Sequence, residues 1–323
     1  MFEHKDISVI IPTYNRAEDL KETLNSFKQH ISKLNEILII DQSKENKTKN
    51  FIRSLRNKKI KYFHLDIPSI AISRNFGIKE SSKKSKLICF LDDDVTISKD
   101  YFNEILDIFN KNKEVVAVGG YQINNLYSTF QKLENVAKKI FFLRHFEKDK
   151  ARIISAYGNT YPLSLKRNIS SQWLPGFNMC YRKEIFKNGM KFDKNLLGYT
   201  IAEDIDFSYR VYKKYGPKSM IITPFAKIVH RASQVERYPT KRMSYVNQID
   251  HFYFYFKNLN RNLKEKLIFA WSLFGITLLR LGNLILKPNK INFLKFIYYI
   301  ESLSYCILNI KKIKNGKLRD FKV

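Results

Sequence analysis

Short apolar runs rich in β-branched residues alternate with longer amphipathic segments along the first part of the chain. The apolar runs span residues 7–11, 36–40, 60–65, 86–91 and 114–120. Between them, apolar or small residues recur at helical spacing in residues 17–29, 69–80 and 99–112. This alternation predicts an α/β fold in which helices flank a central, mostly parallel sheet that is buried on both faces.

The middle of the chain has a mixed pattern that ends in a strongly helical segment. We expect a helix at residues 130–144 and another at 198–216. In the second, Asp206 and Arg210 are four residues apart and can form an ion pair. Gly216 should end that helix, because glycine readily adopts the left-handed conformation of a C-terminal cap.

Polar residues follow three of the predicted strands, at the point where each strand ends. Ile11 is followed by PTYNR, Ile40 by DQS and Leu91 by three consecutive aspartates, Asp92 to Asp94. Because the carboxyl ends of parallel strands meet at one edge of a sheet, we expect these groups to lie close together. Three adjacent carboxylates repel one another unless donors or a cation compensate them, and oxygen ligands suit Mg²⁺ or Mn²⁺. The alternative is a solvated turn that starts the next helix.

The composition indicates a folded protein with a strong basic excess. Hydrophobic residues make up 44% of the 323 residues, and there are 11 Gly and 8 Pro. The formal net charge of +28 favours phosphate-rich partners, namely nucleic acid, anionic lipid or a nucleotide-activated substrate. From residue 231 onward, 18 Lys and Arg stand against 5 Asp and Glu, so the excess is densest there.

The cysteines and the N-terminal segment point to the inside of the cell. Cys89, Cys180 and Cys306 stand singly, without the paired spacing of a disulfide framework or a zinc site. The apolar run before Pro12 is too short for a signal peptide. We therefore expect the α/β part of the protein to remain in the cytoplasm.

Two apolar stretches lie in the basic C-terminal part, at residues 267–279 and 291–310. Neither reaches the roughly 20 uncharged apolar residues of a spanning helix. With lysines on either side, both are typical of helices that lie in an anionic membrane surface. A packed helical domain and a hairpin through the bilayer are the alternatives. We expect two domains, an α/β domain at 1–235 and a helical, membrane-associating region at 236–323.

Six segments of the first 230 or so residues form an ordered set of motifs. They are VIIPTYNR at 9–16, IIDQSKE at 39–45, AISRNFGI at 71–78, FLDDDV at 90–95, LPGFNMCYRKEIF at 174–186 and AEDIDFSYR at 202–210. In this order and spacing the chain resembles glycosyltransferase family 2, the inverting sugar transferases of the GT-A fold. The second motif departs from the usual Asp-Asp-Gly-Ser form, since Gln42 replaces the second aspartate.

The resemblance implies a nucleotide site on the first four motifs. Asp41 would accept a hydrogen bond from the base, with a loop-capping role as the alternative. Arg74 would contact the diphosphate, with a surface ion pair as the alternative. Asp92 would bind the ribose, and Asp93 could instead point away and cap the following segment. The implied nucleotide-binding residues are Pro12, Thr13, Asn15, Arg16, Asp41, Arg74, Asp92 and Asp93.

The resemblance also implies metal ligands and a catalytic base. Asp94 and His230 would hold Mn²⁺ or Mg²⁺, although a hydrogen-bonded structural histidine is the alternative for His230. Asp204 would remove the proton of the acceptor hydroxyl, and Glu203 beside it would orient the acceptor. Alternatively, both are favourable acids at a helix N-terminus, a position that lowers the pKa of a carboxylate.

Together these features imply an inverting glycosyltransferase at the cytoplasmic face of the cell membrane. The donor would be a nucleotide-diphosphate sugar, and the acceptor a saccharide or lipid-linked precursor of a surface glycan. We expect no nucleic-acid partner, because the sequence has no helix-turn-helix, zinc knuckle or aromatic RNA-binding motif. Two alternatives stay open: another nucleotide-using enzyme such as a nucleotidyltransferase, and a non-catalytic basic binder of nucleic acid or lipid.

Overall fold

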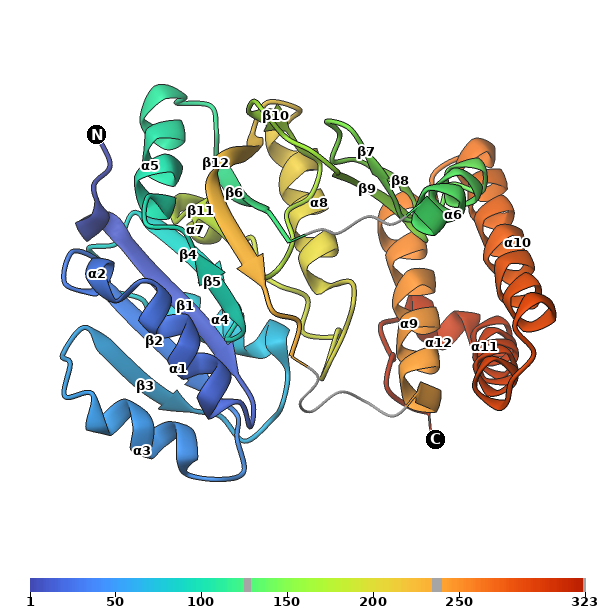
Figure 1. Ribbon diagram of the computed structural model, residues 1–323, viewed down its shortest axis with the longest axis horizontal. Coiled ribbons are helices and arrows are strands. Elements are labelled where there is room, and N and C mark those ends of the chain that lie inside the picture. The colour runs from blue at the N-terminus through green and yellow to red at the C-terminus, as the bar shows by residue number, and fades with distance from the viewer. Residues whose placement is uncertain (125–128, 234–239, 322–323) are drawn as a thin grey trace. The chain divides into compact units, whose positions relative to one another are not determined.

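The computed structural model describes residues 1–124, 129–233 and 240–321. The chain forms two compact units (Figure 1). Unit 1 comprises Met1–Asn125, Ser164–Lys194 and Glu203–Arg237, and unit 2 comprises Leu126–Leu163, Asn195–Ala202 and Tyr238–Val323. The division differs from the expected one at residue 235. The reason is that two earlier segments bond to the C-terminal helices: Trp271 donates to the carbonyl of Ile140, and Thr200 donates to Asp250.

Unit 1 is built on a nine-stranded sheet in the order β10-β12-β6-β11-β4-β1-β2-β3, with β5 paired to β12. The strands are β1 (Ile7–Thr13), β2 (Glu36–Asp41), β3 (Ile60–His64), β4 (Leu87–Leu91), β5 (Val95–Ile97), β6 (Ala117–Gln122), β10 (Ile169–Ser170), β11 (Asn178–Arg182) and β12 (Met220–His230). Strands β3, β2, β1 and β4 are parallel neighbours, whereas β11 is antiparallel to β4 and β6. The expected α/β fold is confirmed, and its sheet is mixed.

Helices cover both faces of this sheet, which explains why every residue of β1 is buried. Val9 and Ile11 pack in one cluster with Leu20 of the first long helix. The intervening Ile10 faces the opposite layer, where a Cβ added to Gly77 would lie 2.6 Å from it. The helices of unit 1 are the short 3₁₀ helix η1 (His4–Asp6), α1 (Ala17–Ser26), α2 (Lys28–Ile31), α3 (Lys47–Ser54), α4 (Ile70–Glu80), α5 (Tyr101–Lys111), α7 (Glu184–Lys187) and α8 (Glu203–Tyr215).

The helix expected at residues 198–216 begins later than predicted. Helix α8 starts at Glu203, because Thr200 and the N–H of Ile201 bond to the Asp250 side chain instead of continuing a helix. Its end agrees with the sequence, since Gly216 adopts a φ of 91°.

Unit 2 combines a small sheet with helices. Its strands β7 (His145–Glu147), β8 (Ile153–Ser155) and β9 (Gly158–Pro162) pair in the order β7-β9-β8. Its helices are α6 (Thr129–Ile140), α9 (Thr240–Phe254), the π-helical turn η2 (Tyr255–Leu259), α10 (Leu263–Leu286), α11 (Lys290–Leu308) and α12 (Ile310–Lys314). Stacked rings hold its elements together: Tyr157 lies 4.4 Å from His251, and Tyr255 lies 3.9 Å from Phe269.

The first apolar stretch of the C-terminal part lies within a longer helix than expected. Helix α10 has 24 residues and, among the described residues, is the one helix long and apolar enough to cross a membrane. Core helices of soluble proteins meet the same criterion of length and composition, but only 11% of the apolar window of α10 is buried within the chain. Residues 267–279 therefore lie in a helix long enough to span, and its association with a membrane stays a prediction.

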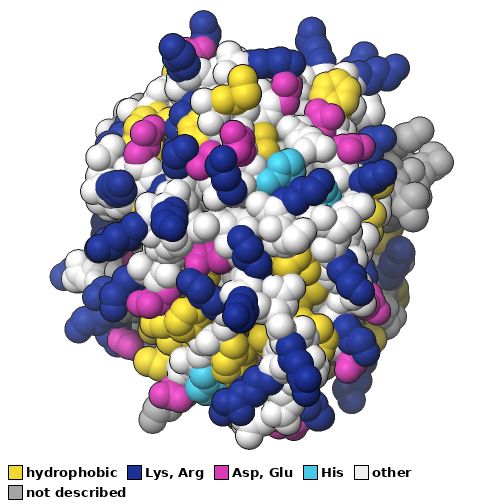
Figure 2. Space-filling model, turned by 90° about the vertical axis from the view of Figure 1, so that its left-hand side faces the viewer, with side chains coloured by type: hydrophobic (Ala, Val, Ile, Leu, Met, Phe, Trp, Pro, Cys, Tyr) yellow, Lys and Arg dark blue, Asp and Glu magenta, His cyan; other side chains and the backbone are white. Residues whose placement is uncertain are grey.

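Charged side chains are spread over the face of the molecule drawn in Figure 2. Lys and Arg side chains occur across this face, and Asp and Glu side chains stand among them. The basic excess does not gather into a single patch on this face.

Candidate active site

The carboxyl ends of β1, β2 and β4 lie at one edge of the sheet in unit 1. The parallel register pairs Thr13 with Asp41, and β4 ends directly before Asp92. His230, the last residue of β12, reaches the same edge because it pairs with Val95 at the start of β5. The convergence expected from the sequence therefore brings the aspartates and His230 together.

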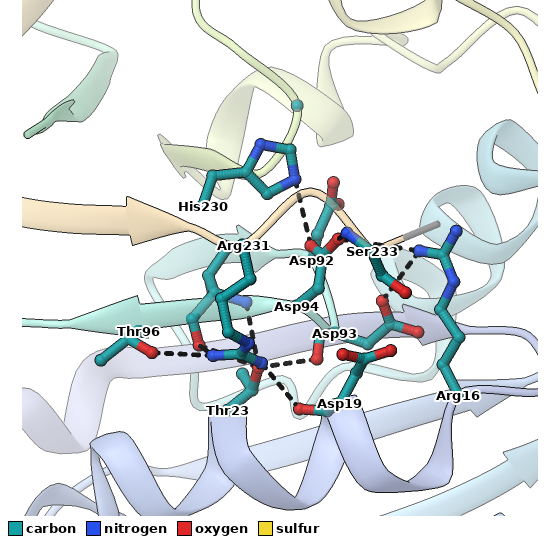
Figure 3. A network of polar contacts seen from close by, with 12 residues as sticks. Arg16, Asp19, Thr23, Asp92, Asp93, Asp94, Thr96, His230, Arg231 and Ser233 are labelled. Carbon is teal, nitrogen blue, oxygen red and sulfur yellow. Dashed lines mark hydrogen bonds and ion pairs between the residues drawn. The ribbon is translucent and has the colours of Figure 1, made fainter. Parts of the chain in front are cut away.

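Asp92, Asp94 and His230 form a group that fits a divalent cation (Figure 3). One ligand atom from each lies within 4.8 Å of the others. Oδ1 of Asp94 is 3.1 Å from Nε2 of His230, yet no described residue offers this buried oxygen a hydrogen bond of good geometry. The His230 ring stacks on Phe177, with centroids 4.4 Å apart, which holds its plane. Two carboxylates and an imidazole suit Mn²⁺, and the carboxylates also suit Mg²⁺.

The surroundings of Asp94 favour its ionised form. The N–H of Ser233 donates to Oδ2 at 2.9 Å, and Arg16 lies 3.8 Å from the same oxygen. Burial raises the pKa of Asp94, but the contact with His230 and the donation from Ser233 outweigh burial, so the pKa lies below its ordinary value. An ionised Asp94 can hold a cation near neutral pH.

Asp93 points away from this group and into the protein. Its carboxylate accepts from Thr13 at 2.6 Å and from Arg16 at 3.3 Å, and its backbone carbonyl accepts from Thr23. Burial raises the pKa of Asp93 to about 7. Asp93 thus follows the alternative in which it points away, and it bonds to Thr13 and Arg16. The nucleotide-binding role of these three residues stays a prediction.

The loops after β1 and β2 are tied together beside a small cavity. Asn15 has a positive φ of 55°; its N–H donates to Ser43, and its side chain accepts from the N–H of Lys44. The cavity of about 200 Å³ is lined by Asn15, Ala17, Ser43, Glu45, Lys47 and Thr48. Of the expected nucleotide-binding residues, Asn15 lines this cavity, whereas Pro12 is buried within β1.

The side chain of Asp41 is fully buried and accepts hydrogen bonds from within the protein, one of them from the loop that follows β2. Oδ1 accepts from the N–H of Ser43 at 2.9 Å, and Oδ2 accepts from the hydroxyl of Tyr62 at 2.8 Å. This geometry favours the loop-capping alternative over a direct contact with a base.

Arg74 is fully buried and its guanidinium contacts groups of the protein, so the contact with a diphosphate stays a prediction. It donates to Glu203 at 2.9 Å, to Asp92 at 3.2 Å and to the carbonyl of Gly176 at 2.9 Å. The guanidinium carbon also lies 5.4 Å from the centre of the Phe192 ring. Arg74 therefore links the cation-binding group to the acids of α8.

The two acids at the start of α8 differ in exposure: Glu203 is buried, whereas Asp204 is half-buried. The carboxylate of Asp204 accepts from the N–H of Gly176 at 2.6 Å and from the N–H of Ile205 at 2.7 Å. Burial raises the pKa of Asp204, and burial together with the charge of Asp204 raises the pKa of Glu203. Burial outweighs the favourable end of the helix, so neither pKa is lowered as the alternative of two acids at a helix N-terminus implied.

Three further residues take part in the site. Asp92, expected at the ribose, stands with the cation-binding residues Asp94 and His230. Gly176 contributes its carbonyl to Arg74 and its N–H to Asp204. Arg231 donates to the carbonyls of Asp19 and Val95 (Figure 3), and so ties β12 to α1 and β5.

Residues 8–189, more than half of the chain, match the family model described as "Glycosyl transferase family 2". The chain belongs to this family. The resemblance drawn from the motifs is thereby confirmed, and the departure at Gln42 does not remove the chain from the family.

Individual members and structures show how far this likeness extends. An uncharacterised glycosyltransferase of Rickettsia conorii is 31% identical over 123 residues, which are 37% of this chain and 20% of that protein. The poly(ribitol-phosphate) beta-N-acetylglucosaminyltransferase TarP of Staphylococcus aureus is 28% identical over 142 residues, 42% of this chain and 41% of that protein. The chain thus spans a minor part of each of these relatives.

A solved structure confirms the GT-A fold. The mannosyltransferase PcManGT from Pyrobaculum calidifontis, in complex with GDP-Man and Mn²⁺, superposes with a TM-score of 0.56 at 13% identity. The superposition covers 95% of this chain and 88% of that one.

Proposed function

We propose that this family member transfers a sugar, with inversion, from a nucleotide-diphosphate sugar to an acceptor hydroxyl, using a divalent cation. One observation carries the proposal: Arg74 joins the cation-binding group to the acids of α8 by contacts to Asp92 and Glu203. A site for a diphosphate and a site for an acceptor base thereby lie within one network of unit 1. The GDP-Man and Mn²⁺ bound by PcManGT support the same donor class and cation.

Each side of this network has a distinct chemical task. A cation held by Asp92, Asp94 and His230 would stabilise the negative charge that grows on the departing nucleoside diphosphate. Asp204 takes the proton of the acceptor hydroxyl as its oxygen bonds to the anomeric carbon and the bond from that carbon to the diphosphate breaks. Its raised pKa makes it a stronger base than a solvated aspartate. The N–H groups of Gly176 and Ile205 aim its carboxylate.

The acceptor we propose is a saccharide or lipid-linked precursor of a surface glycan. TarP, by its name, acts on poly(ribitol-phosphate), a phosphate-rich polymer. The net charge of +28 favours an anionic acceptor of this kind.

We further propose that the protein works at the cytoplasmic face of the cell membrane. Apolar side chains on α10 are exposed within the chain, among them Leu267 at 62% and Ile285 at 68%. Lysines flank α10 and α11 and would favour an anionic lipid surface. Exposed apolar side chains that gather on one helix are typical of surfaces that bind a membrane or a partner.

A donor panel tests the proposed activity. The chain should be stabilised against heat by at least one nucleoside-diphosphate sugar in Mn²⁺, and the product formed from that donor should have the inverted anomeric configuration by NMR. A retained anomer would contradict the mechanism. Release of pyrophosphate instead of a nucleoside diphosphate would identify a nucleotidyltransferase, and salt-sensitive nucleic-acid binding that is indifferent to Asp204→Asn would support the non-catalytic alternative.

A further inference from the structure

The segment that leads into α8 is held by contacts that the proposed reaction does not itself require. This entry segment, Asn195–Ala202, belongs to unit 2. Thr200 Oγ1 donates to Oδ2 of Asp250 at 2.6 Å, and the N–H of Ile201 donates to the same oxygen at 3.2 Å. The N–H of Ala202 in turn donates to Thr200 Oγ1 at 3.3 Å. The backbone that ends directly before Glu203 is therefore fixed by one buried carboxylate.

Asp250 lies on α9 and is fully buried, so its charge needs a partner within the protein. Arg319 supplies that partner: Nη2 donates to Oδ1 of Asp250 at 2.8 Å, and Nε donates to the carbonyl of Leu197 at 3.1 Å. One guanidinium thus contacts both the buried carboxylate and the entry segment. Arg74 has no part in these contacts.

The segment that carries Arg319 is itself docked at several points. Leu318 and Phe321 are 2% and 8% exposed, and Phe321 stacks on Tyr245 of α9 with centroids 5.4 Å apart. Gly316 has a φ of 76°, and a Cβ there would lie 2.5 Å from the side-chain nitrogen of Asn195. These contacts bring residues 316–321 close to the beginning of the entry segment.

We infer that Arg319, acting through Asp250 and Thr200, is a positioning residue for the acid pair of α8. Ala202 is bonded to Glu203, so a fixed entry segment fixes the first turn of α8 and the direction of its carboxylates. This inference rests on the proposed function, since it assigns the effect to the acceptor half of the reaction. A displacement of the base by about 1 Å can reduce turnover roughly a hundredfold while leaving the rest of a site intact.

The test compares Arg319→Ala, Arg319→Lys and the wild-type full chain. Arg319→Ala should lose about tenfold or more in kcat/KM for the acceptor, while donor Kd stays within about twofold. Arg319→Lys keeps the charge and should restore part of the loss. Lys317→Ala, which removes an exposed side chain two residues earlier, is the matched control and should behave as wild type. Equal losses of donor and acceptor affinity would overturn the inference, since they indicate general damage.

Amide hydrogen exchange supplies a readout that does not depend on activity. In Arg319→Ala, residues 197–202 should exchange faster than in the wild type, and unchanged exchange there would overturn the inference. Faster exchange with unchanged acceptor kinetics would also overturn it, because the contacts would then be structural alone. Thr200→Val replaces the hydroxyl by a methyl group of similar size. If Arg319→Ala does not fold, acceptor kinetics and amide exchange of Thr200→Val test the inference by the same criteria. If the wild-type chain transfers no sugar, the proposed function fails, while the exchange measurement still tests whether Arg319 holds the entry segment.

Discussion

At the scale of single residues, burial decides the chemistry of the acids at the start of α8. A helix N-terminus lowers the pKa of a nearby carboxylate by stabilising its negative charge. Glu203 is 5% exposed, and one of its carboxylate oxygens has no hydrogen-bond partner among the described residues. The loss of water around these two adjacent acids raises their pKa values by more than the helix end lowers them, so both pKa values lie above their ordinary values.

This environment predicts the pH dependence of turnover. Asp204 must be ionised to accept a proton, and its raised pKa keeps it protonated to a higher pH than an ordinary aspartate, so kcat should rise with pH above 3.8. The groups that face Asp204 are Arg74, Asp92, Glu203 and the N–H groups of Gly176 and Ile205. Burial and the charge of Asp204 raise the pKa of Glu203 to about 8, so Glu203 is neutral while Asp204 ionises. Glu203→Gln should therefore leave the acidic limb of kcat where it is. A pH profile between about pH 5 and 9 measures this, and a limb moved to lower pH would show that Glu203 is charged while Asp204 titrates.

Loss of the base itself should act on turnover and spare the donor. Asp204→Asn keeps the size of the side chain but removes the proton acceptor, so kcat should fall by about a hundredfold or more with donor Kd little changed. Asp206→Asn on the same helix is the control, because Asp206 forms an ion pair with Arg210 at 2.9 Å and has no proposed part in the chemistry. Near-normal turnover of Asp204→Asn would transfer the role of base to Glu203.

The sequence placed the candidate chemistry at the right edge of the sheet but did not show which groups each side chain contacts. Asp94 could be chosen because it follows a predicted strand, and His230 because the resemblance to the family implied it. The partners of Asp41, Asp93 and Arg74 could not be foreseen, since they depend on side-chain directions and on the depth of burial. Arg74 is an example, because its motif alone does not show whether the guanidinium contacts a phosphate or Glu203.

At the scale of elements, the close packing of α4 on β1 follows from a single glycine. A Cβ at Gly77 would lie 2.6 Å from Cγ2 and 3.0 Å from Cδ1 of Ile10, both inside the core. Gly77→Ala should therefore destabilise the fold by about 1–3 kcal/mol through overpacking, although alanine favours helices. Denaturant unfolding measures this change. A gain in stability, as expected for alanine in an open helix, would contradict the packing described here.

Strands were easier to predict than the start of α8. Strand β1 is apolar on both faces, so its sequence alone reports a buried parallel strand. Helix α8 has helical periodicity from residue 198, but its first turn is replaced by contacts of Thr200 to Asp250, which lies 50 residues away in the chain. Hydrogen bonds between residues far apart in the sequence can thus prevent a helical turn that the local periodicity predicts. The local sequence gives no sign of these bonds.

At the scale of the whole molecule, the exposed apolar side chains of α10 predict membrane binding. Vesicles that contain anionic lipid should bind the full chain, and salt should weaken binding because part of the attraction is electrostatic. Leu281→Asp should weaken binding by about tenfold, since it removes an exposed apolar side chain. Asn283→Asp adds the same charge at an exposed polar position of α10 and is the control.

Vesicle cosedimentation separates the alternatives. Equal binding by Leu281→Asp and Asn283→Asp would show that apolar contact is unimportant. Resistance to high salt and alkaline washing would identify a spanning helix, and an absence of vesicle binding would favour a helical domain covered in another way.

The central claim is that the cation-binding group and the acid pair serve a nucleotide-sugar donor and its acceptor. The most direct measurement is donor affinity of the wild-type chain and of Asp94→Ala, by calorimetry, in Mn²⁺ and in chelator, with the donor that the panel identifies. Wild-type chain in Mn²⁺ should bind the donor, and either chelator or Asp94→Ala should weaken binding by about a hundredfold, since the diphosphate loses its counter-charge. Equal donor affinity in all of these conditions would contradict the account.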